Sequence, residues 1–296
     1  MKILVTGASG LLGCKISLLA LKKGHEVYSV YKEHPVNSGE PVKLDLTCEN
    51  DVFKVFSELK PDAVIHAAAY TDVDGCEANR DMAWRVNAES TRHVAQASAR
   101  MGVHLTYVST DYVFDGEKGL YTEDDEPNPV NYYGYTKLKG EEYVKQHAEQ
   151  WCIARTSVIY GWGVKHRLNF ATWLISNLSQ GREVKTITDQ HVSPTFNTNL
   201  AEMLLEIAER RITGVLHTAG ASRVSRYGFA LKLAEAFKLD ASLVKPAEMS
   251  EMPWKAKRPR DSSLNVDKAT IFLSVKPLRI EQALEMMKKE TFGEAD

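Results

Sequence analysis

The segment NYYGYTKLKGEE, which begins at Asn131, contains the pattern Tyr-x-x-x-Lys twice. The two pairs are Tyr133 with Lys137 and Tyr135 with Lys139. Residues four apart in a helix lie on one face, where the ammonium group can lower the pKa of the phenol and make it an acid that works near neutral pH. The two tyrosines lie about 200° apart around such a helix, so only one pair can face a given site.

Residues at helical spacing distinguish the two faces. The stripe that starts at Tyr133 is small and apolar and includes Gly140 and Val144, whereas the stripe through Tyr135 is polar, which is typical of a solvated face. Burying an unpaired ammonium group is costly, so Lys137 either has a function or extends its head group to water. These residues alone leave both alternatives open.

Short strands and amphipathic helices alternate on both sides of this segment. Between residue 2 and about residue 160, the apolar runs are KILVT, EVYSV, DAVIHAAA, HLTYVST and CIARTSVIY. This βαβ order predicts an α/β fold with a Rossmann doubly wound parallel sheet and helices on both faces. After Tyr160 the rhythm becomes mixed. We therefore predict a Rossmann domain over 1–160 and a smaller mixed α/β lobe over 161–296, with segments near 184–200 returning to the first domain.

The composition excludes several classes of protein. With 296 residues, 44% of them hydrophobic, the chain can form a large core, and its net charge of −2 provides no basic surface for a nucleic acid. Its four cysteines form no Cys-x-x-Cys pair, which argues against a disulfide framework or zinc site and favours the reducing cytoplasm. The first apolar run is too short for a signal peptide, and no stretch reaches the roughly 20 apolar residues of a membrane span.

Three glycines in VTGASGLLG follow the first predicted strand. Gly7, Gly10 and Gly13 would let the backbone turn tightly and approach a pyrophosphate at the positive end of the next helix. Leu11 and Leu12, between these glycines, are expected to contact the same cofactor. The motif alone also fits a tight turn with close helix packing, but it has the strand and helix that dinucleotide binding requires, so we predict a dinucleotide site here.

The end of the second predicted strand indicates which dinucleotide binds. NAD-binding Rossmann proteins carry an acidic residue there, which holds the ribose 2′-hydroxyl. This chain has Tyr31 and Lys32 instead, and a cation favours a 2′-phosphate, so we expect NADPH, with NADH as the alternative. Asp45 and Leu46, after the third strand, are expected at the cofactor. Asp45 is placed to touch the adenine, although a role in capping the loop fits it as well.

Five motifs occur in order along the chain. They are HAAA at 66–69, STDYVFDG at 109–116, YGYTKLKGE at 133–141, DQHVSPT at 189–195 and RPRDSSL at 258–264. Together with the glycines, they resemble the extended short-chain dehydrogenase/reductases, and most closely the dTDP-4-dehydrorhamnose reductase branch, over nearly the whole chain. The resemblance implies a Rossmann fold, a nicotinamide cofactor and a nucleotide-sugar substrate.

The resemblance selects Tyr133 and Lys137 as the catalytic pair and adds Thr110, whose hydroxyl would hydrogen-bond the reacting oxygen. The implied reaction is NADPH-dependent reduction of the C4 keto group of a nucleotide-linked 4-dehydro-6-deoxy sugar, as from dTDP-4-dehydrorhamnose to dTDP-L-rhamnose. Tyr133 would deliver the proton. Lys137 would lower the pKa of Tyr133 and hold the cofactor ribose. Taken alone, a Ser-Thr-Asp sequence at a strand end is also typical of a turn or cap.

The resemblance implies further contacts with cofactor and substrate. Cofactor contacts are expected from Ala67, Ala68, Ala69 and Val108. Substrate contacts are expected from Thr110, Asp111, Val158, Asn169 and Arg258. Arg258 and Arg260 offer guanidinium groups for the diphosphate bridge of the substrate, although a solvated loop explains them equally well.

Several related functions share parts of this pattern. Tyr112 stands where the sugar-nucleotide dehydratases carry a glutamate, which argues against dehydration. NAD-dependent sugar-nucleotide epimerases keep the same triad. The regulatory β subunit of methionine adenosyltransferase shares the fold and motifs but binds a partner enzyme. Some relatives form dimers around a magnesium ion, held partly by a glutamate where this chain has Lys15. We therefore predict no metal site and do not carry over that dimer, while a homodimer as such stays open.

Overall fold

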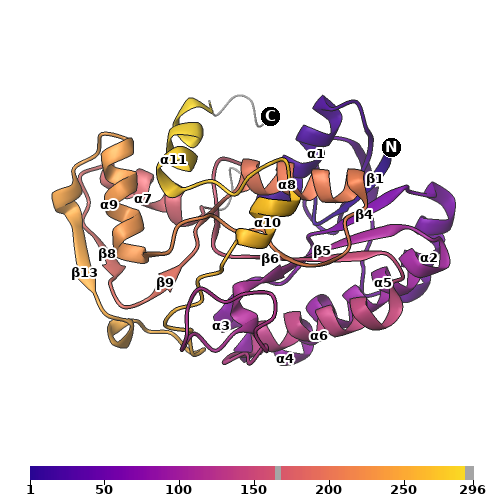
Figure 1. Cartoon of the computed structure of the whole chain (residues 1–296), viewed down its shortest axis with the longest axis horizontal. Helices are drawn as coiled ribbons and strands as arrows, with labels where there is room; N and C mark the ends of the chain where they lie inside the picture. The colour runs from indigo at the N-terminus through magenta and orange to yellow at the C-terminus, as the bar shows by residue number, and fades with distance from the viewer. Residues whose placement is uncertain (164–167, 291–296) are drawn as a thin grey trace.

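A seven-stranded parallel sheet forms the centre of the computed structural model, which describes residues 1–163 and 168–290 (Figure 1). The strand order is β11-β6-β5-β4-β1-β2-β3. The strands are β1 (Lys2–Thr6), β2 (Glu26–Tyr31), β3 (Glu40–Lys43), β4 (Ala63–His66), β5 (His104–Thr110), β6 (Trp151–Thr156) and β11 (Gly214–His217). The order reverses at β1, which pairs with both β2 and β4. Ligands of doubly wound sheets bind at this point, beyond the carboxyl ends of the strands.

Helices cover both faces of this sheet, so its central strands are buried on two sides. One face packs against α1 (Leu11–Lys22), α8 (Asn197–Arg210) and α10 (Asp267–Phe272). The other packs against α2 (Glu49–Leu59), α5 (Ser90–Arg100) and α6 (Tyr132–His147), and Figure 1 shows the two layers on opposite sides. Every residue of β4 and β5 is buried, as expected for central strands of a sheet covered on both faces. The predicted Rossmann fold is confirmed.

The segment between β4 and α5 is divided into several short helical pieces. The helices α3 (Val73–Ala78) and α4 (Arg80–Trp84) come first, and a π-helical turn (Arg85–Glu89) leads into α5. Asn87 in this turn is buried, and its side-chain amide bonds both backbone groups of Tyr70 and the Thr136 hydroxyl on α6. These bonds hold the turn against the helix that carries the Tyr-x-x-x-Lys pairs.

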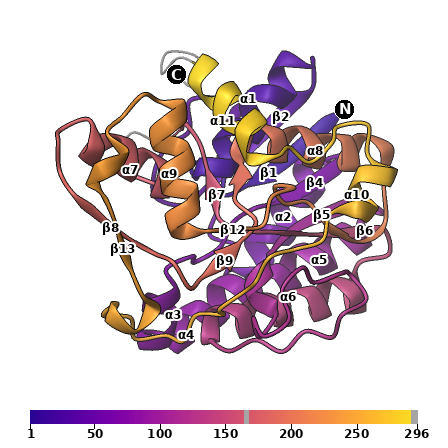
Figure 2. The ribbon, with the colours of Figure 1, turned by 60° about the vertical axis from the view of Figure 1, so that its left-hand side comes forward.

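A second hydrophobic core lies beside the sheet (Figure 2). It is formed by α7 (Phe170–Leu178), α9 (Arg226–Ala236), α11 (Ile280–Lys289), β8 (Val184–Ile187) and β13 (Val244–Ala247). Short strand pairs join it to the sheet region, namely β7 (Ile159–Tyr160) with β10 (Thr195–Phe196) and β9 (His191–Val192) with β12 (Val224–Ser225). Three 3-10 turns cover Asp111–Val113, Ala241–Leu243 and Met249–Glu251.

The chain crosses between the two cores more than once. After the short strands, α8 packs on the large sheet and β11 pairs with β6, and α10 later returns to the same face. The domain limits at residue 160 and the return near 184–200 stay predictions. Residues 164–167 lie outside the described residues. Within the described ranges, no helix is long and apolar enough to cross a membrane.

Candidate active site

A tight turn joins β1 to α1 at the point where the strand order reverses. Gly7 has a φ of +67°, and a Cβ atom there would lie 2.8 Å from the backbone N and Cα of Ala68. A Cβ atom at Gly13 would lie 2.1 Å from the carbonyl oxygen of Gly7. Both positions therefore need glycine, because the turn touches the segment after β4 and the helix touches the turn.

The first turn of α1 presents backbone N–H groups that no side chain caps. The N-cap is Gly10, which has no side chain to accept a hydrogen bond from them. The N–H groups of Leu11, Leu12 and Gly13 begin the helix, where N–H groups have no intrahelical partner and the helix dipole is positive. The structure thus brings the predicted cradle residues together in a form that suits a pyrophosphate.

Lys32 and Asp45 form an ion pair beyond the ends of β2 and β3, with Nζ 3.0 Å from Oδ2. Asp45 also accepts hydrogen bonds from the N–H and hydroxyl of Thr47, so it caps the loop as one of the two alternatives predicted. Burial opposes ionisation of Asp45, but the bonds from Thr47 and Lys32 outweigh it and hold its pKa below the usual range. Lys32 follows Tyr31, the last residue of β2, and Leu46 is buried behind the pair.

A buried histidine ends β4. The Nδ1 atom of His66 lies 2.6 Å from the Thr6 hydroxyl, and its Nε2 atom lies 3.1 Å from the Thr91 hydroxyl. Burial lowers the pKa of His66 to about 3, so the ring is neutral. The N–H of Ala68 donates to the same Thr6 hydroxyl at 3.2 Å. This network holds the Ala67–Ala69 segment against the glycine turn.

Helix α6 turns one of its two Tyr-x-x-x-Lys pairs inward. Lys137 is 2% exposed, whereas Tyr135 is 38% exposed. Lys139 lies beside Tyr135 and pairs on the surface with Glu142 at 2.7 Å. The inward face is therefore the one that carries Tyr133 and Lys137, as the apolar stripe predicts.

The ammonium group of Lys137 lies against β5. Its Nζ atom donates to the carbonyl oxygen of Val108 at 2.8 Å and lies 4.1 Å from the centroid of the Tyr107 ring. Burial lowers the pKa of Lys137 to about 7, and the Glu141 carboxylate opposes this change. Lys137 does not reach bulk water, which rules out the alternative that its head group extends to the solvent.

Tyr133 lies one helical turn before Lys137, beside the end of β5. Burial raises the pKa of its phenol, and a hydrogen bond with the Thr110 hydroxyl opposes this change. The sequence predicts that Lys137 lowers this pKa, but in the structure the ammonium group bonds to Val108 and burial dominates. The Tyr133 ring also meets the Tyr112 ring edge to face, with centroids 6.0 Å apart. The phenol is therefore in its acid form near neutral pH, as proton donation requires.

Asp111 is buried and joins three segments of the chain. Its carboxyl accepts hydrogen bonds from the hydroxyls of Ser157 at 2.8 Å, Ser262 at 2.5 Å and Thr110 at 3.2 Å. Burial raises the pKa of Asp111 to about 6, while these hydrogen bonds act in the opposite direction. Both carboxyl oxygens are occupied by protein groups, so Asp111 holds the Thr110 hydroxyl and the RPRDSSL segment in place.

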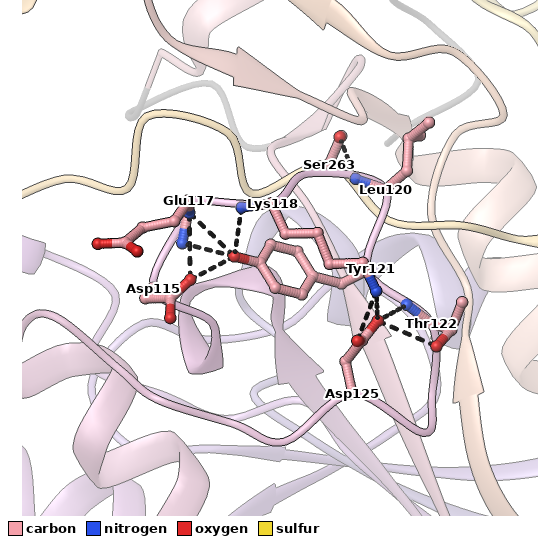
Figure 3. Close-up of polar contacts among 9 residues, drawn as sticks. Asp115, Glu117, Lys118, Leu120, Tyr121, Thr122, Asp125 and Ser263 are labelled. Carbon is pink, nitrogen blue, oxygen red and sulfur yellow. Dashed lines mark hydrogen bonds and ion pairs between the residues drawn. The ribbon is translucent and has the colours of Figure 1, made fainter.

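The loop after β5 is organised by the hydroxyl of Tyr121 (Figure 3). This oxygen accepts the backbone N–H groups of residues 116–118 at 3.0 to 3.2 Å and donates to Asp115. The N–H of Tyr121 donates in turn to the carbonyl oxygen of Ser263 at 2.9 Å. Ser262 directly precedes Ser263 and donates to the Asp111 carboxyl, so the loop also holds Ser262 in place.

Two other predicted substrate residues have structural partners. Val158, after β6, has a φ of 26°, which is strained for a β-branched residue, and its carbonyl oxygen accepts the N–H of Thr195 at 3.1 Å. Asn169 caps α7, because its Oδ1 atom accepts the N–H of Thr172 at 3.3 Å and its Nδ2 atom donates to Gly161 at 2.8 Å. The Asn169 side chain is therefore bonded within the second lobe, and its contact with substrate stays a prediction.

Arg258 is paired rather than solvated. Its guanidinium lies 3.1 Å from each carboxylate oxygen of Asp74 in α3 and stacks on Trp254, 5.0 Å from the ring centroid. Arg260, the other arginine of the motif, is exposed and reaches Asp189 only at 3.5 Å. The alternative of two arginines in a solvated loop therefore fits Arg260 but is wrong for Arg258.

Residues of the second lobe that the sequence did not single out also meet this region. Arg226, the first residue of α9, donates from Nε to the Gln190 side chain at 3.4 Å, and its guanidinium lies 5.0 Å from the centroid of the Phe170 ring. Gln190 donates to the carbonyl oxygen of Pro259 at 3.3 Å. The DQHVSPT motif contains Gln190 and could have signalled it. Arg226 has no such motif, since only folding brings α9 to the end of β5.

The residues around α1 provide no metal site. Within residues 1–163 and 168–290, no group of three or more histidine, cysteine, aspartate or glutamate side chains could hold a metal ion. Lys15, which stands where some relatives have a metal-binding glutamate, lies 2.9 Å from Glu290 at the end of α11. This ion pair joins the first helix of the chain to the last.

Comparisons with known proteins agree over nearly the whole length. The family described as RmlD substrate binding domain matches residues 1–292. The probable low-salt glycan biosynthesis reductase Agl14 of Haloferax volcanii is 36% identical over 88% of this chain and 89% of its own. The dTDP-4-dehydrorhamnose reductase of Aggregatibacter actinomycetemcomitans is 31% identical over 97% and 98%. The methionine adenosyltransferase 2 subunit beta of Danio rerio is 30% identical over 96% and 88%.

Solved structures give the same result. A hypothetical dTDP-4-dehydrorhamnose reductase from Sulfolobus tokodaii has a TM-score of 0.85 and 40% identity, covering 94% of this chain and 97% of its own. The dTDP-4-dehydrorhamnose reductase of Bacillus anthracis, solved in complex with NADP, has a TM-score of 0.88 and 31% identity, covering 98% and 99%. The similarity therefore includes both the sheet region and the second core.

Proposed function

The chain belongs to the RmlD substrate binding domain family, and from this premise we propose that it reduces the C4 keto group of a nucleotide-linked 4-dehydro-6-deoxy sugar with NADPH. As an extended short-chain dehydrogenase/reductase, it is an NAD(P)-dependent oxidoreductase. The substrate that we propose is dTDP-4-dehydrorhamnose, which would be converted to dTDP-L-rhamnose. The observation that carries the proposal is the inward pair of Tyr133 and Lys137 beside Thr110.

The residues at the switch point suit a dinucleotide. The N–H groups that open α1 would hold its pyrophosphate. Gly7 contacts Ala68 closely and has no side chain, so only backbone would face that group. Lys32 would bind a 2′-phosphate with the same ammonium group that pairs with Asp45. Lys137 would hold the nicotinamide ribose. When bound, NADPH supplies the hydride that goes to the sugar carbon.

The protein's own part in the reaction is to donate and position a proton. Burial keeps the phenol of Tyr133 protonated, so its O–H bond can break and the proton can pass to the sugar oxygen as negative charge develops there. The phenolate that remains can accept a hydrogen bond from Thr110 when the single hydroxyl hydrogen of Thr110 turns from Asp111 toward it. The Thr110 hydroxyl is itself fixed by Asp111, whose other partners, Ser157 and Ser262, anchor the segments around it.

The test is NADPH oxidation by the purified protein, supplied with freshly made dTDP-4-dehydrorhamnose, with Tyr133→Phe as the control variant. We expect turnover by the wild type and a loss of about 10²- to 10⁴-fold in the variant, since proton transfer of this kind contributes that much. Unchanged NADPH affinity in the variant would show that the loss is chemical. Equal turnover by both proteins would overturn the assignment of Tyr133.

A second candidate is a regulatory role without catalysis. It is favoured by the 30% identity with the methionine adenosyltransferase 2 subunit beta of Danio rerio. NADPH binding without turnover of any nucleotide sugar, together with copurification of an adenosyltransferase, would support it. An NAD-dependent epimerase is the remaining alternative, and NAD bound in a stoichiometric amount after purification would support that. A cytoplasmic location and a homodimer stay predictions.

A further inference from the structure

Arg226 differs from other arginines near the site in having no carboxylate partner. Arg258 is held by Asp74, and Arg155 is held by Glu141. In the part of the chain that the structure describes, Arg226 forms no ion pair, and its charged group has only neutral partners. Its positive charge is therefore not neutralised by a bonded group of the protein.

The neutral partners of Arg226 hold its guanidinium in one place. Its Nε atom donates to Gln190 at 3.4 Å, its planar group lies over the Phe170 ring, and the Tyr112 hydroxyl is close enough to favour its charge. Gln190 is anchored by Pro259, next to Arg258. A guanidinium fixed in this way loses little further freedom when it binds a ligand, which favours binding.

The environment makes an unpaired charge unfavourable. Burial lowers the pKa of Arg226, and the positive charge of Arg258 acts in the same direction, whereas Asp111 and Tyr112 oppose it. Asp111 is not a direct partner, because its carboxyl oxygens bond three hydroxyl groups and no ion pair joins it to Arg226 among the described residues. Arg226 is half-buried, and a charge that is partly removed from water without a bonded partner costs free energy that an anionic ligand would recover.

The position of Arg226 lies beside the proposed catalytic groups. Tyr112, which it contacts, follows Thr110 and Asp111 in the chain and packs edge to face against Tyr133. Arg226 itself comes from α9 in the second lobe. The second lobe thus places a positive charge next to the Tyr112 ring, which packs against Tyr133.

We propose that Arg226 binds the anionic diphosphate bridge of the nucleotide-sugar substrate. The inference rests on the proposed function, since it takes a nucleotide sugar as the ligand. It assigns the recognition of negative charge to Arg226 rather than to Arg258, which Asp74 already neutralises.

The experiment measures binding at equilibrium, without turnover. The affinities of dTDP, UDP-glucose and UDP-glucuronic acid are measured by calorimetry for the wild type, Arg226→Gln and Arg226→Lys. The matched control is Lys232→Gln, which removes one positive charge from the same helix, at an exposed surface pair with Glu281. NADPH affinity and the melting temperature of each protein show whether a variant is folded.

If Arg226 binds the diphosphate, Arg226→Gln will weaken dTDP binding by about tenfold or more, which is the worth of a charge-assisted hydrogen bond. Arg226→Lys will lose less, and Lys232→Gln will bind as the wild type does. A loss of affinity for UDP-glucuronic acid alone would place Arg226 at the sugar rather than at the diphosphate and would overturn the inference. In each case NADPH affinity will stay unchanged.

Equal affinities for all three ligands in the wild type and Arg226→Gln would overturn the inference and leave the proposed function intact. The inference also fails if Arg226→Gln melts earlier but binds each ligand normally, because the arginine would then be structural only. If the wild type binds none of the three ligands, both the inference and the proposed function fail.

Discussion

Arg155 and Glu141 form a buried, two-pronged ion pair between β6 and α6. The Nε and Nη2 atoms of Arg155 lie 2.9 Å and 2.7 Å from the two carboxylate oxygens, and both side chains are almost fully buried. Ser109 donates a further hydrogen bond to the same carboxylate at 2.6 Å. Glu141 lies one turn beyond Lys137, so the ion pair fixes the helix that carries the inward lysine. The Glu141 carboxylate also partly offsets the lowering of the Lys137 pKa by burial.

The first prediction concerns this pair. Glu141→Gln should lower the free energy of unfolding by about 3 to 5 kcal/mol, because it leaves the Arg155 charge buried without a partner. Glu142→Gln, at the next position, removes an exposed carboxylate paired with Lys139 and should cost no more than about 1 kcal/mol. Urea denaturation of the two variants measures the difference. Equal losses would contradict the role of the buried pair.

The second prediction is a pH dependence of stability from Lys137. Its pKa is about 7 in the folded, ligand-free protein, below the usual value of about 10.4 for an unfolded chain. Between these values the unfolded state binds the extra proton, so the stability of the wild type should rise with pH by about 1.4 kcal/mol per pH unit from this group. Lys137→Met should lack this component.

Urea denaturation from pH 7 to 9.5 measures the difference between wild type and Lys137→Met at each pH. Groups that titrate in both proteins cancel in this difference, so a rise with pH isolates the lysine. A constant difference over the range would show that Lys137 remains charged in the folded protein.

The third prediction separates the two Tyr-x-x-x-Lys pairs. The double variant Tyr135→Phe/Lys139→Met should keep the keto-sugar reductase activity of the wild type within about twofold, because both residues lie on the outer face of α6. Lys137→Met should lose activity and weaken NADPH binding. Steady-state rates and NADPH titrations test this. A large loss of turnover in the outer-face variant, with NADPH binding intact, would mean that the wrong pair has been assigned.

The fourth prediction concerns the glycine turn. Gly7→Ala should weaken NADPH binding by about tenfold or more and destabilise the protein, because its Cβ atom would meet the backbone of Ala68 at 2.8 Å and push the turn away. Gly24→Ala is the matched control, since Gly24 has a φ of +82° with nothing within 4 Å of a Cβ atom. It bears the same kind of backbone strain, of about 1 to 2 kcal/mol, without the contact.

Fluorescence titration with NADPH and thermal unfolding separate the two effects of these variants. Strain alone predicts a lower melting temperature for both, whereas loss of the dinucleotide site predicts weaker binding for Gly7→Ala only. Normal NADPH affinity in Gly7→Ala would exclude the turn as part of that site.

Much of the fold followed from local sequence patterns. Continuous apolar runs between amphipathic helices predicted the parallel sheet, and the glycines after the first run predicted the turn that the structure places at the switch point. The apolar stripe on α6 predicted which face would be buried, and hence which lysine. These features depend on residues close in the chain, whose spacing alone decides which face of a helix or strand is apolar.

The charges of the site depend on contacts between distant segments, and there the sequence was insufficient. The motif RPRDSSL contains two arginines of similar appearance, yet Asp74, far away in the chain, pairs with one of them. The expected effect of Lys137 on the Tyr133 pKa was overridden by burial, which depends on how the helix packs on β5. No local sequence pattern indicates a role for Arg226, because its neighbours come from four separate segments.

The sequence by itself determined the order of strands and helices, the glycine turn and the inward face of α6, since each follows from the local periodicity of side chains. Only the tertiary structure decided which ionisable groups are paired, which are buried, and which charge is left for a ligand. The physical reason is that a side chain's pKa and its ion pairs depend on the groups that folding brings around it, and a linear spacing does not specify those.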